Sequence, residues 1–197
     1  NRNIESEVKV IQDDFFVLYS GNLGASHDID SILSAAEILR PHKTIRFIFI
    51  GDGEKRNAVE SYIQRFPSQN VRLFPFQPEG LLSYTLSLAD VSLVTLGKGM
   101  EDLMVPSKFF SYLAAGSAIL GIAHDNSELS NLIDSQGCGI RVPPGCPDKL
   151  AKILLMMSKD TNVLNNFKRQ ARVLAELKYA KEVGVKSFKK IIASQLA

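Results

Sequence analysis

The chain has 197 residues, 45% of them hydrophobic and 22% charged, and a formal net charge of +2. These ordinary values fit one globular domain and exclude a strong bulk attraction to nucleic acid. No stretch approaches the roughly 18 consecutive apolar residues of a membrane-spanning helix. Cys138 and Cys146 are too few for a disulfide framework, and their spacing does not make a metal site. We therefore expect a cytoplasmic protein with reduced cysteines.

The N-terminal part predicts a tail followed by a strand and a helix. Residues 1–13 are polar and charged, unlike a signal peptide, and are interpreted as a linker or tail before a domain over 14–197. The apolar run 15–19 predicts a buried strand that ends at Ser20-Gly21. After a loop, Asp28 can cap a helix that continues to about residue 39.

The same alternation of strand and helix continues along the chain. Short apolar runs predict strands at 45–50, 71–75, 90–96, 117–123 and 138–142. Amphipathic segments predict helices at about 54–66, 79–88, 106–115 and 126–135, with helical structure after the turn at 143–145. The pattern predicts an α/β fold, a doubly wound parallel six-stranded sheet of the Rossmann-like kind with helices on both faces.

In such a sheet the ligand lies beyond the carboxyl ends of the strands, so the loops there are the candidates. The first is loop 20–27, in which Gly21 and Gly24 allow close backbone approach and a helix start follows. Ordinary turn glycines are the alternative. The spacing is not GxGxxG, which disfavours a nicotinamide cofactor.

The second candidate is the segment 105–108, where Ser107 and Lys108 meet a helix start. A hydroxyl, free backbone N–H groups and an ammonium together favour an anion. An ordinary cap with a solvated lysine is the alternative, but the ligand-facing position favours binding.

The third candidate is the segment 124–128, where Glu128 either contacts a ligand or belongs to a capping pattern. Asp28 and Asp30 have the Asp-x-Asp spelling of a metal–nucleotide site. Because they open a helix, we interpret them as capping residues.

Several segments together resemble the C-terminal domain of the retaining group 1 family of GT-B glycosyltransferases, from about residue 15 to the C-terminus. Their order and spacing carry the resemblance: 21–24 (GNLG), 49–53 (FIGDG), 71–76 (VRLFPF), 89–91 (ADV), 105–108 (VPSK), 113–120 (LAAGSAIL), 126–129 (NSEL) and 137–142 (GCGIRV). The Pro-Ser-Lys variant is most similar to bacterial surface-polysaccharide enzymes.

The resemblance implies a role for each candidate loop. The loop 21–24 would face the donor sugar and pyrophosphate, and backbone at Phe76 and Gln77 would contact the base. Ser107 and Lys108 would hold the pyrophosphate, and Glu128 would lie near the sugar. No metal or other cofactor is implied.

The chain departs from the family pattern at two places. The family usually has a basic pair in the first loop, where this chain has Asn22 and His27. Its two glutamates would fall at Leu103 and Ser111, so the ribose contact is unassigned unless Glu101 or Asp102 substitutes.

The resemblance implies a transferase that moves a sugar from a nucleotide diphosphate, expected to be UDP, to a polysaccharide or lipid-linked acceptor. The acceptor would bind an N-terminal domain that this chain lacks, so we expect the isolated domain to be inactive. A GT-B-type nucleotide-sugar epimerase and a non-catalytic Rossmann-like binding module are the alternatives. The sugar, linkage and oligomeric state are not determined by the sequence.

The C-terminal segment 168–192 is basic and amphipathic. It carries eight basic residues, Lys168, Arg169, Arg172, Lys178, Lys181, Lys186, Lys189 and Lys190. Packing on this domain is one interpretation of its apolar positions, and contact with the missing domain is another. A third is peripheral contact with anionic lipid at the inner face of the membrane.

Overall fold

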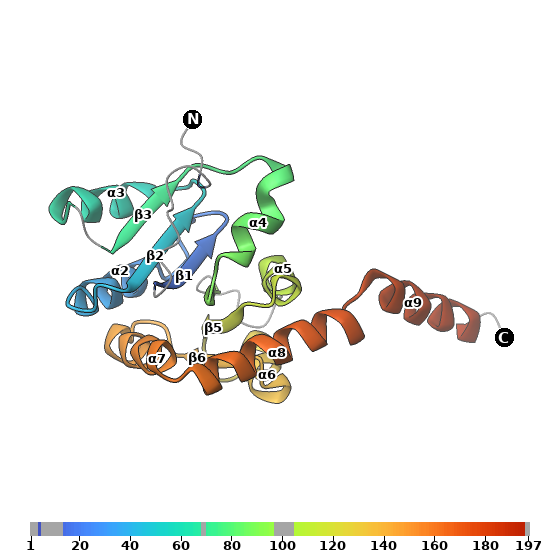
Figure 1. The fold of residues 1–197 in the computed structure, drawn as a ribbon. Coiled ribbons are helices and arrows are strands. Elements are labelled where there is room, and N and C mark those ends of the chain that lie inside the picture. Colours follow the sequence, from blue (N-terminus) through green and yellow to red (C-terminus); the bar gives the residue numbers. More distant parts are fainter. Residues whose placement is uncertain (1–3, 5–13, 68–69, 97–104, 196–197) are drawn as a thin grey trace.

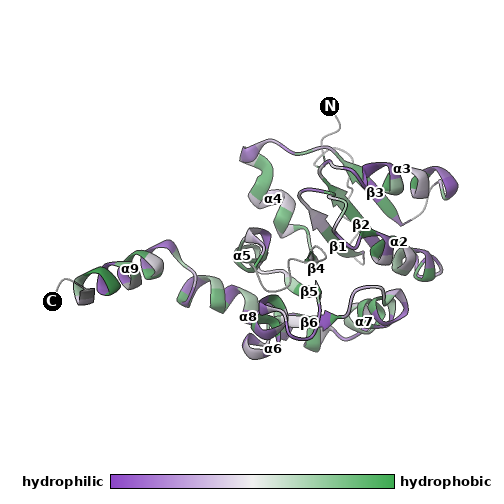
Figure 2. Cartoon of the chain, turned by 180° about the vertical axis from the view of Figure 1, so that it is seen from behind, coloured by the Kyte–Doolittle hydropathy of each residue, from purple (hydrophilic) through white to green (hydrophobic). Residues whose placement is uncertain are grey.

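The computed structural model describes residue 4 and residues 14–67, 70–96 and 105–195. Its centre is a six-stranded sheet made of β1 (Phe15–Ser20), β2 (Ile45–Ile50), β3 (Val71–Phe74), β4 (Val91–Thr95), β5 (Ala118–Ile122) and β6 (Gly139–Val142). All strand pairs are parallel and the order is β3-β2-β1-β4-β5-β6. Figure 1 labels every strand but β4, which is labelled in Figure 2. The expected doubly wound fold is confirmed.

The helices connect these strands. They are α2 (Ile29–Ile38), α3 (Arg56–Arg65), a 3₁₀ turn (Glu79–Leu81) leading into α4 (Leu82–Ser87), α5 (Ser107–Ala115), α6 (Glu128–Gln136), α7 (Pro147–Lys159), α8 (Thr161–Leu177) and α9 (Lys181–Gln195). The expected cap at Asp28 is confirmed, because its side chain accepts from the backbone N–H group of Ser31. Ser127 caps α6 in the same way by accepting from Ser130 N–H. Pro106 was expected to be the first residue of its helix. In the structure it is the N-cap residue, and α5 begins at Ser107.

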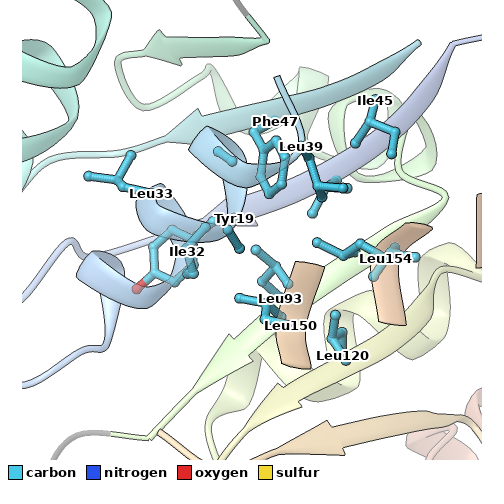
Figure 3. Close-up of a cluster of buried hydrophobic side chains, with 14 of the residues drawn as sticks. Tyr19, Ile32, Leu33, Leu39, Ile45, Phe47, Leu93, Leu120, Leu150 and Leu154 are labelled. Atoms are coloured by element: carbon cyan, nitrogen blue, oxygen red, sulfur yellow. The ribbon is translucent and has the colours of Figure 1, made fainter. Parts of the chain in front are cut away.

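Two hydrophobic clusters hold the helices to opposite faces of the sheet. Alternate residues of β1 supply each of them, Val17 and Tyr19 to one and Phe16 and Leu18 to the other. The first cluster packs α2, α3 and α7, and Figure 3 shows Tyr19 among its side chains. The second packs α4, α5, α6 and part of α8. Burial on both faces explains why the strands are apolar runs rather than alternating ones.

The N-terminal tail expected over 1–13 lies outside the described residues, except for Ile4. The Ile4 side chain is buried in the second cluster, and its backbone N–H donates to Gln77 Oε1 at 3.2 Å. This residue is therefore part of the domain's packing rather than of a solvated tail.

The C-terminal helices differ in how they are held. α8 packs against α5, α7 and the strands, whereas α9 extends away from the domain beyond a break at residues 178–180 (Figure 1). Among the described residues, no helix is both long and apolar enough to cross a bilayer.

Candidate functional site

The carboxyl ends of the parallel strands bring the first two loops of the sheet into contact. Loop 21–28 follows β1 and loop 51–55 follows the neighbouring β2. Two backbone hydrogen bonds of 2.8 Å join them, Leu23 N–H to Asp52 O and Lys55 N–H to Leu23 O. A third bond of 2.8 Å runs from Gly21 N–H to the carbonyl oxygen of Ile50, the last residue of β2. The conformation of the first loop is therefore set before any ligand arrives.

Glycines 51 and 53 make this contact possible. A Cβ atom at Gly51 would lie 2.0 Å from Gly21 O, and one at Gly53 would lie 2.6 Å from Asn22 Oδ1. Both residues also have φ near +140°, a conformation that residues with a side chain rarely adopt (139° and 143°). Only glycine fits at either position.

Lys108 extends from the first turn of α5 to the underside of loop 21–28. Its Nζ lies 4.2 Å from the centre of the Tyr19 ring and 3.1 Å from where a Cβ atom at Gly21 would stand. This ammonium is buried and has no hydrogen-bond partner in the described part of the chain. Burial lowers the pKa of Lys108 to about 8. An unpartnered buried cation is costly, and an anion at the loop would relieve that cost.

A second lysine nearby has hydrogen-bond partners and offers a contrast. Lys55 Nζ donates to Asp30 Oδ2 at 2.6 Å and to the carbonyl oxygen of His27 at 2.8 Å. It thereby holds the loop to the start of α2. Of these two cations, Lys108 is the one without any hydrogen-bond partner among the described residues.

Tyr19 organises the loop from below. Its hydroxyl donates to the carbonyl oxygen of Asn22 at 2.7 Å and lies 2.5 Å from His27 Nδ1. Burial, with a smaller contribution from Tyr112, raises the pKa of Tyr19, so the hydroxyl keeps its proton. We call the group formed by Tyr19, Gly21, Asn22, His27 and Lys108 the edge cluster.

Tyr112 and Asp28 fix the surroundings of the edge cluster. The Tyr112 hydroxyl accepts from Ser20 N–H at 2.9 Å and donates to Ser20 O at 3.0 Å. The Asp28 backbone N–H donates to Thr95 Oγ1 at 3.1 Å, and its carboxylate accepts from Gly145 N–H at 2.8 Å. Asp28 thus caps a helix and also ties three edge loops together, which supports a structural role rather than metal binding.

Phe76 and Gln77 follow β3 on the far side of loop 51–55. The Phe76 side chain is 61% exposed, and its Cε1 lies 3.4 Å from where a Cβ atom at Gly51 would stand. Gln77 Nε2 donates to Pro75 O, while its Oε1 accepts from Ile4 N–H. The segment therefore borders the two interlocked loops, with an exposed ring beside them.

The other predicted residues lie at the same edge but farther along it. Ser107, exposed, opens α5 next to Lys108, and Glu128, exposed, opens α6. No hydrogen bond or ion pair among the described residues joins Glu128 to the edge cluster. Gly24 belongs to the cluster's surroundings, since a Cβ atom there would lie 3.1 Å from Asn22 Nδ2.

The ribose contact remains unassigned. Leu103, Glu101 and Asp102 lie outside the described residues. Ser111 is exposed and lines a groove of about 430 Å³ between α4 and α5, with Arg172 of α8 and without a carboxylate in its lining. The position that the family fills with glutamate therefore carries only a hydroxyl here.

Tyr19 and Tyr112 are site residues that the sequence interpretation missed. Both were assigned only to a strand and a helix. A tyrosine as the penultimate residue of an otherwise apolar strand was the available signal, because a buried hydroxyl needs a partner and that partner lies in the adjoining loop.

Comparison with known proteins identifies the domain. Residues 1–174 match the family described as "Glycosyl transferases group 1". The chain belongs to this group 1 glycosyltransferase family. The expected family is thereby confirmed, and neither the epimerase nor the non-catalytic alternative gains support.

The curated relatives of this group 1 domain are named as glycosyltransferases. The chain is 35% identical over 136 residues to the probable glycosyltransferase WbjE of Pseudomonas aeruginosa, covering 69% of this chain and 34% of the relative. It is 29% identical over 155 residues to the putative colanic acid biosynthesis glycosyl transferase WcaI of Escherichia coli K12, covering 77% and 38%. The chain thus spans little more than a third of the relatives that it matches.

Solved structures agree on the fold. The structure of Anabaena Alr3699/HepE in complex with UDP-glucose aligns with a TM-score of 0.73 at 17% identity, covering 93% of this chain and 48% of that one. The glycosyltransferase WaaG, involved in lipopolysaccharide biosynthesis, aligns with a TM-score of 0.70 at 16% identity, covering 90% and 47%. These similarities confirm a GT-B-type Rossmann-like domain.

Proposed function

We propose that this domain binds the diphosphate of a nucleotide sugar, with UDP as the nucleotide, at the carboxyl edge of the sheet. The observation that carries the proposal is the Lys108 ammonium, which is buried, unpartnered and held beneath the glycine loop. The start of α5 adds free backbone N–H groups to this charge. The UDP-glucose held by the structurally similar HepE supports the choice of ligand.

The remaining ligand parts follow from the loop positions. Gly21, Asn22 and Gly24 would lie against the pyrophosphate and sugar, Ser107 would add a hydroxyl donor, and Glu128 would approach the sugar from α6. Phe76 and Gln77 would border the base. Each of these contacts rests on the shared edge of the sheet and on the family resemblance.

In the whole protein we propose transfer of the sugar with retention of its anomeric configuration to a polysaccharide or lipid-linked acceptor. The bond from the anomeric carbon to the β-phosphate oxygen breaks, and a bond to the acceptor oxygen forms. The acceptor's proton passes to the departing diphosphate. Lys108 and backbone dipoles would stabilise the negative charge of that leaving group, without a metal or other cofactor.

A single domain forms only one wall of the catalytic cleft proposed for the whole protein. Positioning of the acceptor supplies much of such a rate, so we expect negligible turnover by this 197-residue chain. Incubation with UDP-glucose and candidate acceptors, followed by product detection, checks this. Robust transfer would show that the second domain is dispensable.

The decisive experiment is calorimetry of UDP binding to the chain and to Lys108→Ala. Charge-assisted hydrogen bonds to phosphate are worth about 1.5–3 kcal/mol, which corresponds to a loss of roughly 10- to 150-fold in affinity. The exposed Lys152 on α7 provides a matched control, and Lys152→Ala should leave affinity unchanged. Equal affinities of wild type and Lys108→Ala would contradict the proposal.

We also propose peripheral contact of α9 with the anionic inner face of a membrane. Its basic and apolar side chains support this localisation, since such helices lie in the interfacial plane. No nucleic-acid partner is proposed.

A further inference from the structure

The hydrogen bonds of Tyr19 determine which nitrogen of His27 carries a proton. The Tyr19 hydroxyl has a single proton and lies within hydrogen-bond distance of two groups, the Asn22 carbonyl at 2.7 Å and His27 Nδ1 at 2.5 Å. A carbonyl oxygen cannot donate, so the tyrosine proton points to Asn22. His27 Nδ1 must then carry the hydrogen and donate to Tyr19 Oη, because otherwise two lone pairs would face each other.

The remaining nitrogen of His27 is therefore a hydrogen-bond acceptor in the neutral ring. Burial lowers the pKa of His27, and the positive charges of Lys108 and Lys55 lower it further. The ring is consequently neutral at physiological pH. Among the described residues, Nε2 has no partner, so its lone pair is available to a ligand.

Gly24 lies beside this acceptor. A Cβ atom at Gly24 would lie 3.8 Å from His27 Cδ2, the ring carbon bonded to Nε2, and 3.1 Å from the amide nitrogen of Asn22. The exposed Asn22 side chain and the Nε2 side of the His27 ring thus flank the same glycine. The Asn22 amide offers N–H donors, and His27 Nε2 offers an acceptor.

An unprotonated nitrogen does not suit a phosphate oxygen, because both are acceptors. It suits a hydroxyl group, which can donate. Resting on the proposed function, we propose that His27 is a specificity-determining residue that accepts a hydrogen bond from a hydroxyl of the donor sugar. Lys108 binds the diphosphate, and the two side chains divide the recognition of the nucleotide sugar between them.

The test compares affinities for UDP and for UDP-glucose, UDP-galactose and UDP-N-acetylglucosamine by calorimetry. Wild type should bind the preferred sugar nucleotide about 3- to 10-fold more tightly than UDP, the range expected for one hydrogen bond. In His27→Phe this ratio should fall toward one, because the ring remains and the acceptor is gone. In His27→Lys the ratio should also fall while UDP itself binds more tightly, because the new cation reaches the phosphate.

Two further variants separate this role from general structural damage. Lys108→Met should weaken UDP and the sugar nucleotide by the same factor and leave the ratio unchanged. His42→Phe alters a histidine just before β2, at the opposite edge of the sheet, and should change neither affinity. Thermal melts of all variants confirm that they fold.

The outcomes are distinguishable. A wild type that binds UDP but prefers no sugar nucleotide overturns the role of His27, as does a His27→Phe variant that loses UDP and sugar nucleotide equally. A wild type that binds no UDP overturns the proposed function itself, and the inference with it.

Discussion

The edge cluster and helix α9 are held in place in opposite ways. In the edge cluster, each loop bonds to another loop or to a buried tyrosine, so the domain itself determines the positions of its side chains. α9 projects from the domain, and the contacts that hold α8 do not extend to it (Figure 1). Figure 2 shows hydrophobic and hydrophilic residues alternating along α9.

The unfavourable free energy of each region has a different origin. The edge cluster buries a cation that has no hydrogen-bond partner among the described residues, and a bound anion would lower that cost. α9 leaves four apolar side chains 45–65% exposed, namely Val185, Phe188, Ile191 and Ile192. Burial of these side chains would require a further surface. The first region is preorganised for a ligand, whereas the second depends on a partner for its own placement.

The largest expected effect comes from adding a methyl group to one glycine in each region. Gly51→Ala places Cβ 2.0 Å from Gly21 O at a φ of +139°, and should destabilise the domain by about 3 kcal/mol. Gly184→Ala in α9 meets nothing within 4 Å and should raise helix content without changing the main unfolding midpoint. Urea unfolding followed by circular dichroism measures both. Equal destabilisation by the two changes would remove the contrast between the regions.

The next prediction concerns binding of α9 to an anionic membrane surface. Lys186 and Lys190 lie on the side of the helix away from the exposed apolar residues, and Lys189 borders them, four positions after Val185. Each of the three lysines should contribute about 1 kcal/mol near anionic lipid. Replacing all three with glutamine should weaken binding to phosphatidylglycerol vesicles by roughly 100-fold at low salt. Flotation of both proteins at low and high salt measures this.

The matched control replaces three exposed lysines of α7, Lys149, Lys152 and Lys159, in the same way. These changes remove equal charge without touching α9. If they reduce flotation as much, or if wild type does not float with anionic vesicles, α9 does not bind the membrane.

The smallest effect separates binding from stability at Lys108. Lys108→Met removes a buried, unpartnered ammonium and should stabilise the domain by about 1–3 kcal/mol at pH 7 while weakening UDP binding. The folded pKa of about 8 lies below the value of 10.5 expected for an unfolded lysine. Between these values the unfolded chain binds more protons, so wild-type stability should rise with pH and approach that of the variant.

Denaturant unfolding from pH 7 to pH 10 checks this convergence. Lys186→Met in α9, which replaces an exposed lysine by the same residue, is the control. A constant gap between Lys108→Met and wild type across this range would show that Lys108 is not buried as an unpaired cation.

The sequence determined the layered fold because its signals are local. Six apolar runs of strand length, the cap residues Asp28 and Ser127, and the αL glycine at Gly116 act within a few residues of themselves. The same locality placed Gly21, His27, Lys108 and Glu128 at the ligand edge, since parallel strands must end on one side. Their assignment to phosphate, sugar or base came from the family resemblance.

Which of these residues come into contact depends on the packing of elements that are distant in the sequence. Lys108 follows Tyr19 by almost ninety positions, and no local pattern places its ammonium over that ring. The Tyr19 hydroxyl then sets the tautomer of His27, and Gly51 sets the path of the loop above it. These contacts depend on the packing of α5 and of the loop after β2 against β1 and its loop.

For α9 the sequence determined the helix and its amphipathic character, but its place depends on a surface outside the domain, because burial of its apolar side requires a partner.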